Sequence, residues 1–302
     1  MVEAGSMIEQ QSDAEVRRAG AAGDELRARL RGMWASVAGE WQKHAGYVDE
    51  RGAPITEKML ERALPQPGER VLELASGPGS VGLAAAPRVA PDGEVVISDL
   101  VAEMTSIAAA RAEASGVENV STKVLDLERI EEADESYDVV LCREGLMLVP
   151  DPARAAHEIR RVLRPGGRVA IAVWGPRERN PWLGIVFDTV SAQLGAPTPP
   201  LGMPHPFSLD DAGRLAALLA AAGLSAVSVD EVTTPYEAAS VDEWWGRSCA
   251  LAGPLAQKLA QLPQPAAQAL RARAADAARR YRTPGGGLHI PGVSLIAAAG
   301  RI

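Results

Sequence analysis

Acidic residues stand near the ends of three successive apolar segments of this sequence. They are Glu73, Asp99 and Asp126, in the segments "RVLEL" (70–74), "GEVVISDL" (93–100) and "VSTKVLDL" (120–127). If the segments are parallel strands, their carboxyl ends meet at one edge of a sheet, where such folds bind ligands. An unpaired carboxylate is costly to bury, so acids there are expected to hold a ligand's hydroxyl or amino groups. The alternative is that each acid is a solvated loop residue or a helix cap.

A glycine-rich turn follows the first of these acids. Gly77, Gly79 and Gly82 have the Gly-x-Gly-x-x-Gly spacing of dinucleotide-binding turns. Glu73 precedes the turn, where such folds usually have an apolar residue, and its carboxylate would repel a pyrophosphate. A cationic ligand with an amine and a sulfonium is favoured instead. An NAD-dependent oxidoreductase stays open as the less favoured alternative.

Strand-like and helix-like segments alternate from residue 70 to residue 174. Strands are predicted at 70–74, 93–100, 120–127, 136–143 and 167–174, and helices at 79–90, 101–115 and 152–163. This alternation predicts an α/β fold, a Rossmann-like and mostly parallel sheet with helices on both faces. Two later apolar segments, 224–232 and 292–301, are predicted to complete seven strands as an antiparallel C-terminal hairpin at the sheet edge.

Four parts of the chain differ in composition. We expect a disordered tail (1–20), an N-terminal helical cap (21–66), the Rossmann-like core (67–175) and a substrate-cap region with a helical lid insertion that also carries the last strands (176–302). Within the N-terminal cap, helices are predicted at 22–45 and 55–63. The proline-dense stretch 196–206 is predicted to be an extended loop.

The composition bounds the partners of the protein. The 302 residues carry a net charge of −8, which argues against nucleic acid or an anionic membrane as the main partner. No apolar run approaches the roughly 20 residues of a membrane span. The two cysteines are far apart and lack metal-ligand spacing, so no metal and a cytoplasmic location are expected. The sequence does not indicate an oligomeric state.

Five motifs in order resemble those of class I S-adenosylmethionine-dependent methyltransferases. They are "VLELASGPG", "VVISDL", "VLDLERI", "SYDVVLC" and "HEIRRVLRPGGRVAIAVW", which fall within residues 68–175. The chain is most similar to the quinone-biosynthesis (ubiquinone/menaquinone) C-methyltransferase type. The resemblance implies S-adenosyl-L-methionine as cofactor, S-adenosyl-L-homocysteine as product and a small-molecule methyl acceptor. One departure is Ala75, where the family often has glycine.

The resemblance also assigns roles to single residues. Glu73 would orient the methionine amino group, Asp99 the ribose hydroxyls and Asp126 the adenine amino group. The full implied cofactor site is Glu73, Ala75, Ser76, Gly77, Gly79, Asp99, Leu100, Met104, Asp126, Leu127 and Arg143.

The acceptor side is less defined by the sequence. An aromatic pocket for a small hydrophobic or aromatic molecule is predicted from Trp41, Met147, Trp174 and Trp182. Its polar anchors would be Arg177, Arg179 and Asn180, unless these belong to a solvated loop. Glu144 and His289 are the candidate bases, and positioning without a base is the alternative.

Methyl transfer to O, C or N of the acceptor is therefore expected. A non-catalytic S-adenosylmethionine-binding module is a second hypothesis. No Asn/Asp-Pro-Pro-Tyr motif follows the fourth strand, where "CREGLM" stands instead, which argues against amino-group methylation of nucleic acid bases.

Overall fold

A seven-stranded sheet of order β3-β2-β1-β4-β5-β9-β6 forms the centre of the computed structural model, which describes residues 23–302. The predicted tail, 1–20, lies outside the described residues. The strands are β1 (Arg70–Leu74), β2 (Glu94–Asp99), β3 (Val120–Val124), β4 (Tyr137–Arg143), β5 (Leu163–Trp174), β6 (Ser225–Thr233) and β9 (Val293–Gly300). β9 runs antiparallel to both β5 and β6, and the other neighbours are parallel. The predicted fold class, with its late antiparallel pair, is confirmed.

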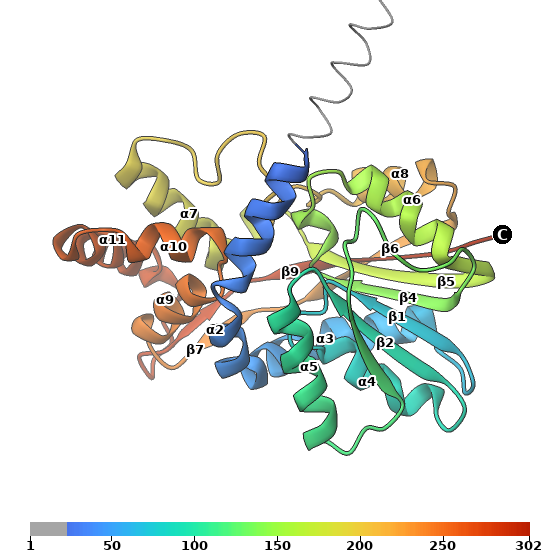
Figure 1. Ribbon diagram of the computed structural model, residues 1–302. Coiled ribbons are helices and arrows are strands. Elements are labelled where there is room, and N and C mark those ends of the chain that lie inside the picture. The colour runs from blue at the N-terminus through green and yellow to red at the C-terminus, as the bar shows by residue number, and fades with distance from the viewer. Residues whose placement is uncertain (1–22) are drawn as a thin grey trace, which may run out of the picture.

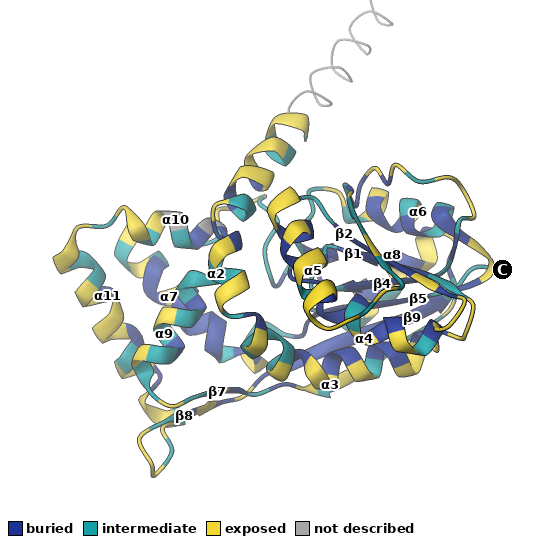
Figure 2. Ribbon diagram, turned by 60° about the horizontal axis from the view of Figure 1, so that its bottom comes forward, coloured by how far each residue is buried: buried dark blue, intermediate teal, exposed yellow. Residues whose placement is uncertain are grey.

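The central strands are buried on both sides. In β1 and β4 nearly every residue is buried, as expected for parallel strands covered by helices on both faces. Figure 2 shows these strands in dark blue beneath helices whose outer faces are exposed. The strand order reverses between β1 and β4, and this reversal opens a crevice at their carboxyl ends.

Two groups of helices cover the two faces of the sheet. α3 (Ala45–Ala63) packs beside α4 (Ser80–Val89), and α6 (Pro152–Val162) packs beside α8 (Ala212–Ala221) on the opposite face. α5 (Ala102–Ala114) packs on β2 and β3. Figure 1 shows α6 and α8 above the sheet and α3 and α4 below it. The N-caps of α6 and α8 are Asp151 and Asp211, each of which accepts a first-turn backbone N–H.

The N-terminal helices differ from the prediction. Residues 23–35 are helical, α2 is Ala38–Lys43, and α3 runs without interruption from Ala45 to Ala63 through Pro54. The expected helices, 22–45 and 55–63, therefore had the wrong boundaries. Ile55, Met59 and Leu60 are buried against the sheet, and this packing outweighs the cost of a proline inside the helix.

The remaining elements gather beyond the carboxyl ends of the strands, at the left of Figure 1. They are α7 (Pro181–Leu194), α9 (Val241–Ala250), α10 (Pro254–Ala260), α11 (Gln264–Ala277) and the two-stranded sheet of β7 (Tyr236–Ala238) and β8 (Leu288–Ile290), with short 3₁₀ turns at Leu146–Leu148, Arg177–Arg179 and Arg279–Tyr281. The proline-dense stretch 196–206 contains no helix or strand. We call these elements, with that stretch, the cap.

None of the helices within residues 23–302 combines the length and the apolar character needed to cross a membrane.

Candidate functional site

Two adjoining cavities lie at the carboxyl ends of the strands. The smaller has a volume of about 140 Å³ and lies over β1 and β2, whereas the larger has about 730 Å³ and lies under the cap. Six residues line both of them: Leu30, Trp34, Trp41, Arg143, Glu144 and Leu148. The two cavities therefore share a wall.

Most of the predicted cofactor residues come together in the smaller cavity. Its walls contain Ala75, Ser76, Gly77, Asp99, Leu100, Met104, Asp126, Leu127 and Arg143. The parallel pairing of β1, β2 and β3 places their ends side by side, which is why residues far apart in sequence meet here. Glu73 and Gly79 do not line it. Their roles toward a ligand stay predictions.

The turn after β1 has left-handed backbone at three positions. Ala75, Gly77 and Gly79 have φ values of 50°, 52° and 82°. A Cβ atom on Gly79 would approach the Ala108 Cβ to 2.8 Å, so the turn needs glycine there for space as well as for conformation. Ala75 pays the steric cost of this conformation, since left-handed backbone disfavours residues with a side chain.

Replacing Ala75 with glycine is expected to stabilise the protein. Relief of the left-handed strain gains about 1–2 kcal/mol. The greater freedom of glycine in the unfolded chain costs about 0.5–1 kcal/mol. We expect a net gain of about 0.5–1 kcal/mol in the free energy of unfolding, measured by urea denaturation. A loss of stability in Ala75→Gly would show that the alanine methyl group is needed for packing.

Asp99 joins the glycine turn to the start of α5. Its Oδ2 accepts the Gly77 N–H (2.8 Å) and its Oδ1 accepts the Val101 N–H (3.0 Å). Burial raises the pKa of Asp99 to about 6, although these N–H groups oppose the rise. A carboxylate has about four lone-pair sites, and the N–H groups of Gly77 and Val101 occupy two of them. Asp99 therefore has the capacity to accept two hydroxyl groups of a ligand.

Glu73 lies behind the turn rather than on the cavity wall. It is fully buried, and its carboxylate accepts the backbone N–H groups of Val81 (3.2 Å) and Gly82 (2.8 Å) in the first turn of α4. A Cβ on Gly82 would lie 2.6 Å from Glu73 Oε2, so this glycine is explained by close packing. Burial raises the pKa of Glu73 to about 7, against the effect of the Gly82 and Val81 N–H groups and of Arg143.

This raised pKa predicts a pH-dependent contribution to stability. The unfolded carboxyl has an ordinary pKa of 4.5, so between this value and about 7 the folded state binds more protons than the unfolded state. The stability that Glu73 contributes therefore falls as the pH rises through this range. We expect the unfolding free energy of the wild type, relative to Glu73→Gln, to fall by about 1–3 kcal/mol from about pH 5 to about pH 8. A constant or rising difference would contradict the assignment.

An N-terminal helical residue closes the far end of the smaller cavity. Arg27 Nε lies 3.8 Å from Asp126 Oδ2, and Arg27 Nη1 donates a hydrogen bond to Glu128 Oε2 (3.2 Å). Glu128 also accepts the Asp151 N–H and is almost fully buried. Sequence reasoning missed Arg27, because nothing in the helical stretch 22–45 indicated where this stretch would pack. It therefore also missed the partner of Arg27, Glu128. Figure 1 shows this helix, in blue, between the cap and α5.

Among residues 23–302, one buried polar atom on a residue that lines both cavities has no hydrogen-bond partner. It is Nε1 of Trp41, whose ring lies against Gly77. A buried indole N–H normally has an acceptor. The acids of the smaller cavity and this free donor suit a polar ligand with hydroxyl and amino groups, so they fit the adenosine and methionine parts of S-adenosylmethionine.

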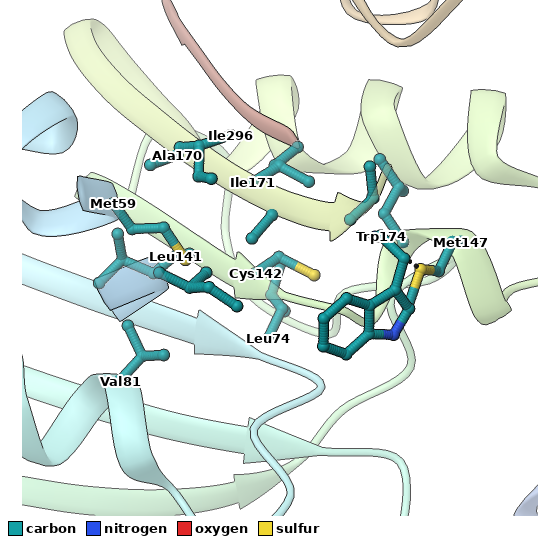
Figure 3. Close-up of a cluster of buried hydrophobic side chains, with 14 of the residues drawn as sticks. Met59, Leu74, Val81, Leu141, Cys142, Met147, Ala170, Ile171, Trp174 and Ile296 are labelled. Atoms are coloured by element: carbon teal, nitrogen blue, oxygen red, sulfur yellow. Dashed lines mark hydrogen bonds between the residues drawn. The ribbon is translucent and has the colours of Figure 1, made fainter. Parts of the chain in front are cut away.

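Aromatic and apolar side chains form most of the larger cavity. All four predicted pocket residues, Trp41, Met147, Trp174 and Trp182, line it. Trp174 and Trp182 meet edge to face, with ring centroids 5.1 Å apart. Figure 3 shows Trp174 and Met147 in one cluster with hydrophobic core residues of the sheet, and the Trp174 backbone N–H donates to Met147 Sδ (3.5 Å). The sheet core thus fixes this wall.

The charged residues Arg51, Arg143 and Glu144 line the larger cavity, and Arg143 and Glu144 also line the smaller one. Arg143 Nη1 donates to Thr56 Oγ1 (2.8 Å), and Arg51 lies over aromatic rings. Glu144 has a left-handed backbone (φ 61°), a strained conformation that often marks functional sites. Burial raises the pKa of Glu144, and the charges of Arg143 and Arg51 oppose this rise. Glu144 lines both cavities, as a base candidate should.

Other predicted polar residues lie elsewhere. His289 is on β8, pairs with Glu237 and lines neither cavity. Arg177 and Arg179 form ion pairs with Asp188 and Glu231. Asn180 is fully buried and bonds the backbone of Gly175 and Val293. These three residues hold the loop after β5 and do not border the pocket. The cationic anchors on its wall, Arg51 and Arg247, were missed.

Comparisons with known proteins agree with this geometry. A family model described as "Methyltransferase domain" matches residues 65–181. Nocamycin O-methyltransferase of Saccharothrix syringae is 32% identical over 195 residues, which cover 59% of this chain and 69% of that protein. Arsenite methyltransferase of Halobacterium salinarum is 42% identical over 106 residues, or 35% of this chain. The match spans only 27% of the length of that second relative.

The fold also has close counterparts among solved structures. The YcgJ protein from Bacillus subtilis superimposes with a TM-score of 0.57 at 20% identity, covering 82% of this chain and 97% of that one. This likeness concerns the fold. The match to nocamycin O-methyltransferase extends over more than two thirds of that relative. Together with the sheet order and the matching family model, this match identifies the protein family. The chain belongs to the class I S-adenosylmethionine-dependent methyltransferases.

Proposed function

We propose that the protein transfers the methyl group of S-adenosylmethionine to a small, largely apolar molecule bound in the larger cavity. The observation that carries this proposal is the common wall of the two cavities. It is formed by Arg143 at the end of β4, by Glu144 and Leu148 in the segment that follows, and by residues of the N-terminal helices. Cofactor and acceptor would meet at this wall. The volume of about 730 Å³ is typical of small-molecule sites.

The smaller cavity supplies the cofactor contacts in this proposal. Asp99 would accept the ribose hydroxyls, Asp126 the adenine amino group, and Leu100, Met104 and Leu127 would pack against the base. Glu73 would act from behind, by holding the start of α4 so that the glycine turn keeps its shape. When bound, S-adenosylmethionine supplies a methyl group on a sulfonium, which is already activated for transfer.

The protein's own contribution is then alignment and exclusion of water. Aromatic walls and the cap keep the larger cavity apolar, so the acceptor is held without competing solvent. Glu144, at the common wall, is positioned to take a proton from an acceptor that must lose one. An acceptor that is already anionic needs no base.

The chemistry of the wall favours an organic acceptor. Within the described part of the chain no cysteine lines the larger cavity, so it offers no thiolate to a soft element such as arsenic. Burial also raises the pKa of the Cys142 and Cys249 thiols to about 12. Oxygen is the proposed acceptor atom, as the name of the nocamycin relative states for that protein; carbon and nitrogen are the alternatives. The quinone C-methyltransferase type remains a prediction from sequence.

Calorimetry with the purified protein tests the proposal. We expect binding of S-adenosylmethionine and S-adenosylhomocysteine and none of NADH. Transfer of a labelled methyl group to members of an acceptor library would then establish catalysis. Binding of the cofactor without transfer to any acceptor would support the non-catalytic binding module, and binding of NADH alone would support the oxidoreductase.

A further inference from the structure

We propose that Arg51 binds a carboxylate of the methyl acceptor, so that the acceptor is an apolar carboxylic acid rather than a neutral molecule. The inference rests on the proposed function, because it specifies what occupies the larger cavity. Its basis is a buried guanidinium that forms no ion pair with any of the described residues.

Aromatic rings surround the Arg51 guanidinium. Its Cζ lies 4.1 Å from the ring centroid of Trp182, 4.7 Å from that of Trp174 and 5.0 Å from that of Tyr236. Nε and Nη2 of Arg51 are buried and have no hydrogen-bond partner in the part of the chain that the structure describes. Cation–π contacts compensate only part of the cost of burying a charge. A ligand with an opposite charge would complete the site.

The acids near Arg51 bind other residues, are exposed, or form no ion pair with Arg51 among the described residues. Asp49 binds Arg111 and accepts the Ser80 hydroxyl, and Glu50 is exposed. Glu144 interacts electrostatically with Arg51, but among the described residues it forms no ion pair with it. The helix that carries Arg51 therefore brings a cation to the cavity without its partner.

The larger cavity as a whole is cationic, although the chain carries a net charge of −8. Among the described residues, its charged lining consists of five cations, Arg29, Arg51, Arg143, Arg247 and Lys258, and one acid, Glu144. Arg29 and Lys258 are exposed. Arg143 has Thr56 as partner and Arg247 has Glu243. Among the described residues, Arg51 is thus the lining cation that has buried N–H groups without a hydrogen-bond partner and also forms no ion pair.

A carboxylate suits this cation better than other anions do. It carries one charge, which one guanidinium balances, and its planar oxygens match the planar donor group. A phosphate carries more charge and is strongly hydrated, so the surrounding tryptophan rings would penalise it. The same rings provide an apolar surface for the body of the acid.

Binding of matched acid and amide probes tests the inference. The probes are 2-naphthoate, indole-3-acetate and dodecanoate, each compared with its neutral amide at neutral pH by calorimetry. The wild type is expected to bind at least one acid about tenfold or more tightly than its amide. Arg51→Met should abolish this preference, whereas Arg29→Met, the same change at the exposed rim, should keep it. Arg51→Lys should keep part of it.

Equal binding of acids and amides, no binding of any probe, or a preference that survives in Arg51→Met would overturn the inference. S-adenosylhomocysteine binding is measured on the same samples. If the wild type does not bind S-adenosylhomocysteine, the proposed function is refuted. If it binds S-adenosylhomocysteine but shows no preference for acids over amides, only the role of Arg51 is refuted.

A second measurement needs no ligand. If Arg51 serves a ligand, replacing its unpaired buried charge by methionine should leave the melting temperature unchanged or raise it. A marked fall in the melting temperature of Arg51→Met would show a structural role and would contradict the inference.

Discussion

Replacing Asp99 with alanine should weaken S-adenosylmethionine binding by about 100-fold or more. The carboxylate is expected to accept two ribose hydroxyls while it also accepts the Gly77 and Val101 N–H groups. Hydrogen bonds to a charged group contribute about 1.5–3 kcal/mol each, so the loss of two accounts for this factor. Titration calorimetry of the purified variant measures it.

Two variants serve as controls for this result. Asp92→Ala changes an exposed acid in the loop before β2 and should leave the affinity unchanged. Asp99→Asn keeps an acceptor oxygen for one of the two N–H groups and should fall between the wild type and Asp99→Ala. If Asp99→Ala folds as the wild type does and binds within threefold of it, the ribose assignment is wrong.

Replacing Trp244 with alanine should lower the free energy of unfolding by about 3–5 kcal/mol. The side chain has no exposed surface, and its Nε1 donates to the Trp182 carbonyl (3.0 Å). It thereby joins α9 to α7, the helix that brings Trp182 to the larger cavity. Urea denaturation followed by circular dichroism measures the loss.

Trp245 provides a matched control for this substitution. It is the next residue on α9, its ring contacts Trp244, and it is only partly buried. Trp245→Ala should cost clearly less than Trp244→Ala, and equal costs would contradict the packing argument. Neither tryptophan lines the smaller cavity, so both variants should bind S-adenosylhomocysteine as the wild type does.

The sheet and the cofactor residues could be predicted because one rule connects them. Parallel strands bring their carboxyl ends to one edge, so Asp99 and Asp126 had to lie close to the glycine turn once the strands were recognised. The role of Glu73 is different. Its place in the sequence predicts a residue at the edge, but only the structure shows that its carboxylate turns toward the N–H groups of α4.

The acceptor side could not be predicted to the same degree. Arg51 lies among charged residues in "VDERG", and nothing local separates it from its exposed neighbour Glu50. One signal was available: Tyr47, Arg51 and Ile55 are spaced four residues apart, so they share one helix face. This spacing predicts a shared face only if residues 47–55 form one continuous helix. Gly52 and Pro54 are residue types that disfavour a helix interior.

The loop after β5 shows the opposite error. Its arginines and Asn180 have the residue types of a polar binding site, yet they hold the chain to itself. Asn180 bonds the backbone of this loop and of the first residue of β9, and so satisfies buried backbone groups where the sheet pairing ends. Residue type alone does not distinguish this role from ligand binding.

The helix at residues 23–35 and α2 supply Leu30, Trp34 and Trp41 to both cavities. One segment of the chain therefore forms part of the wall of both cavities. We expect the exchange of spent cofactor and of methylated product to be kinetically linked, so that an occupied acceptor cavity slows cofactor release. The rate of turnover would then depend on how often this segment opens as much as on the transfer step itself.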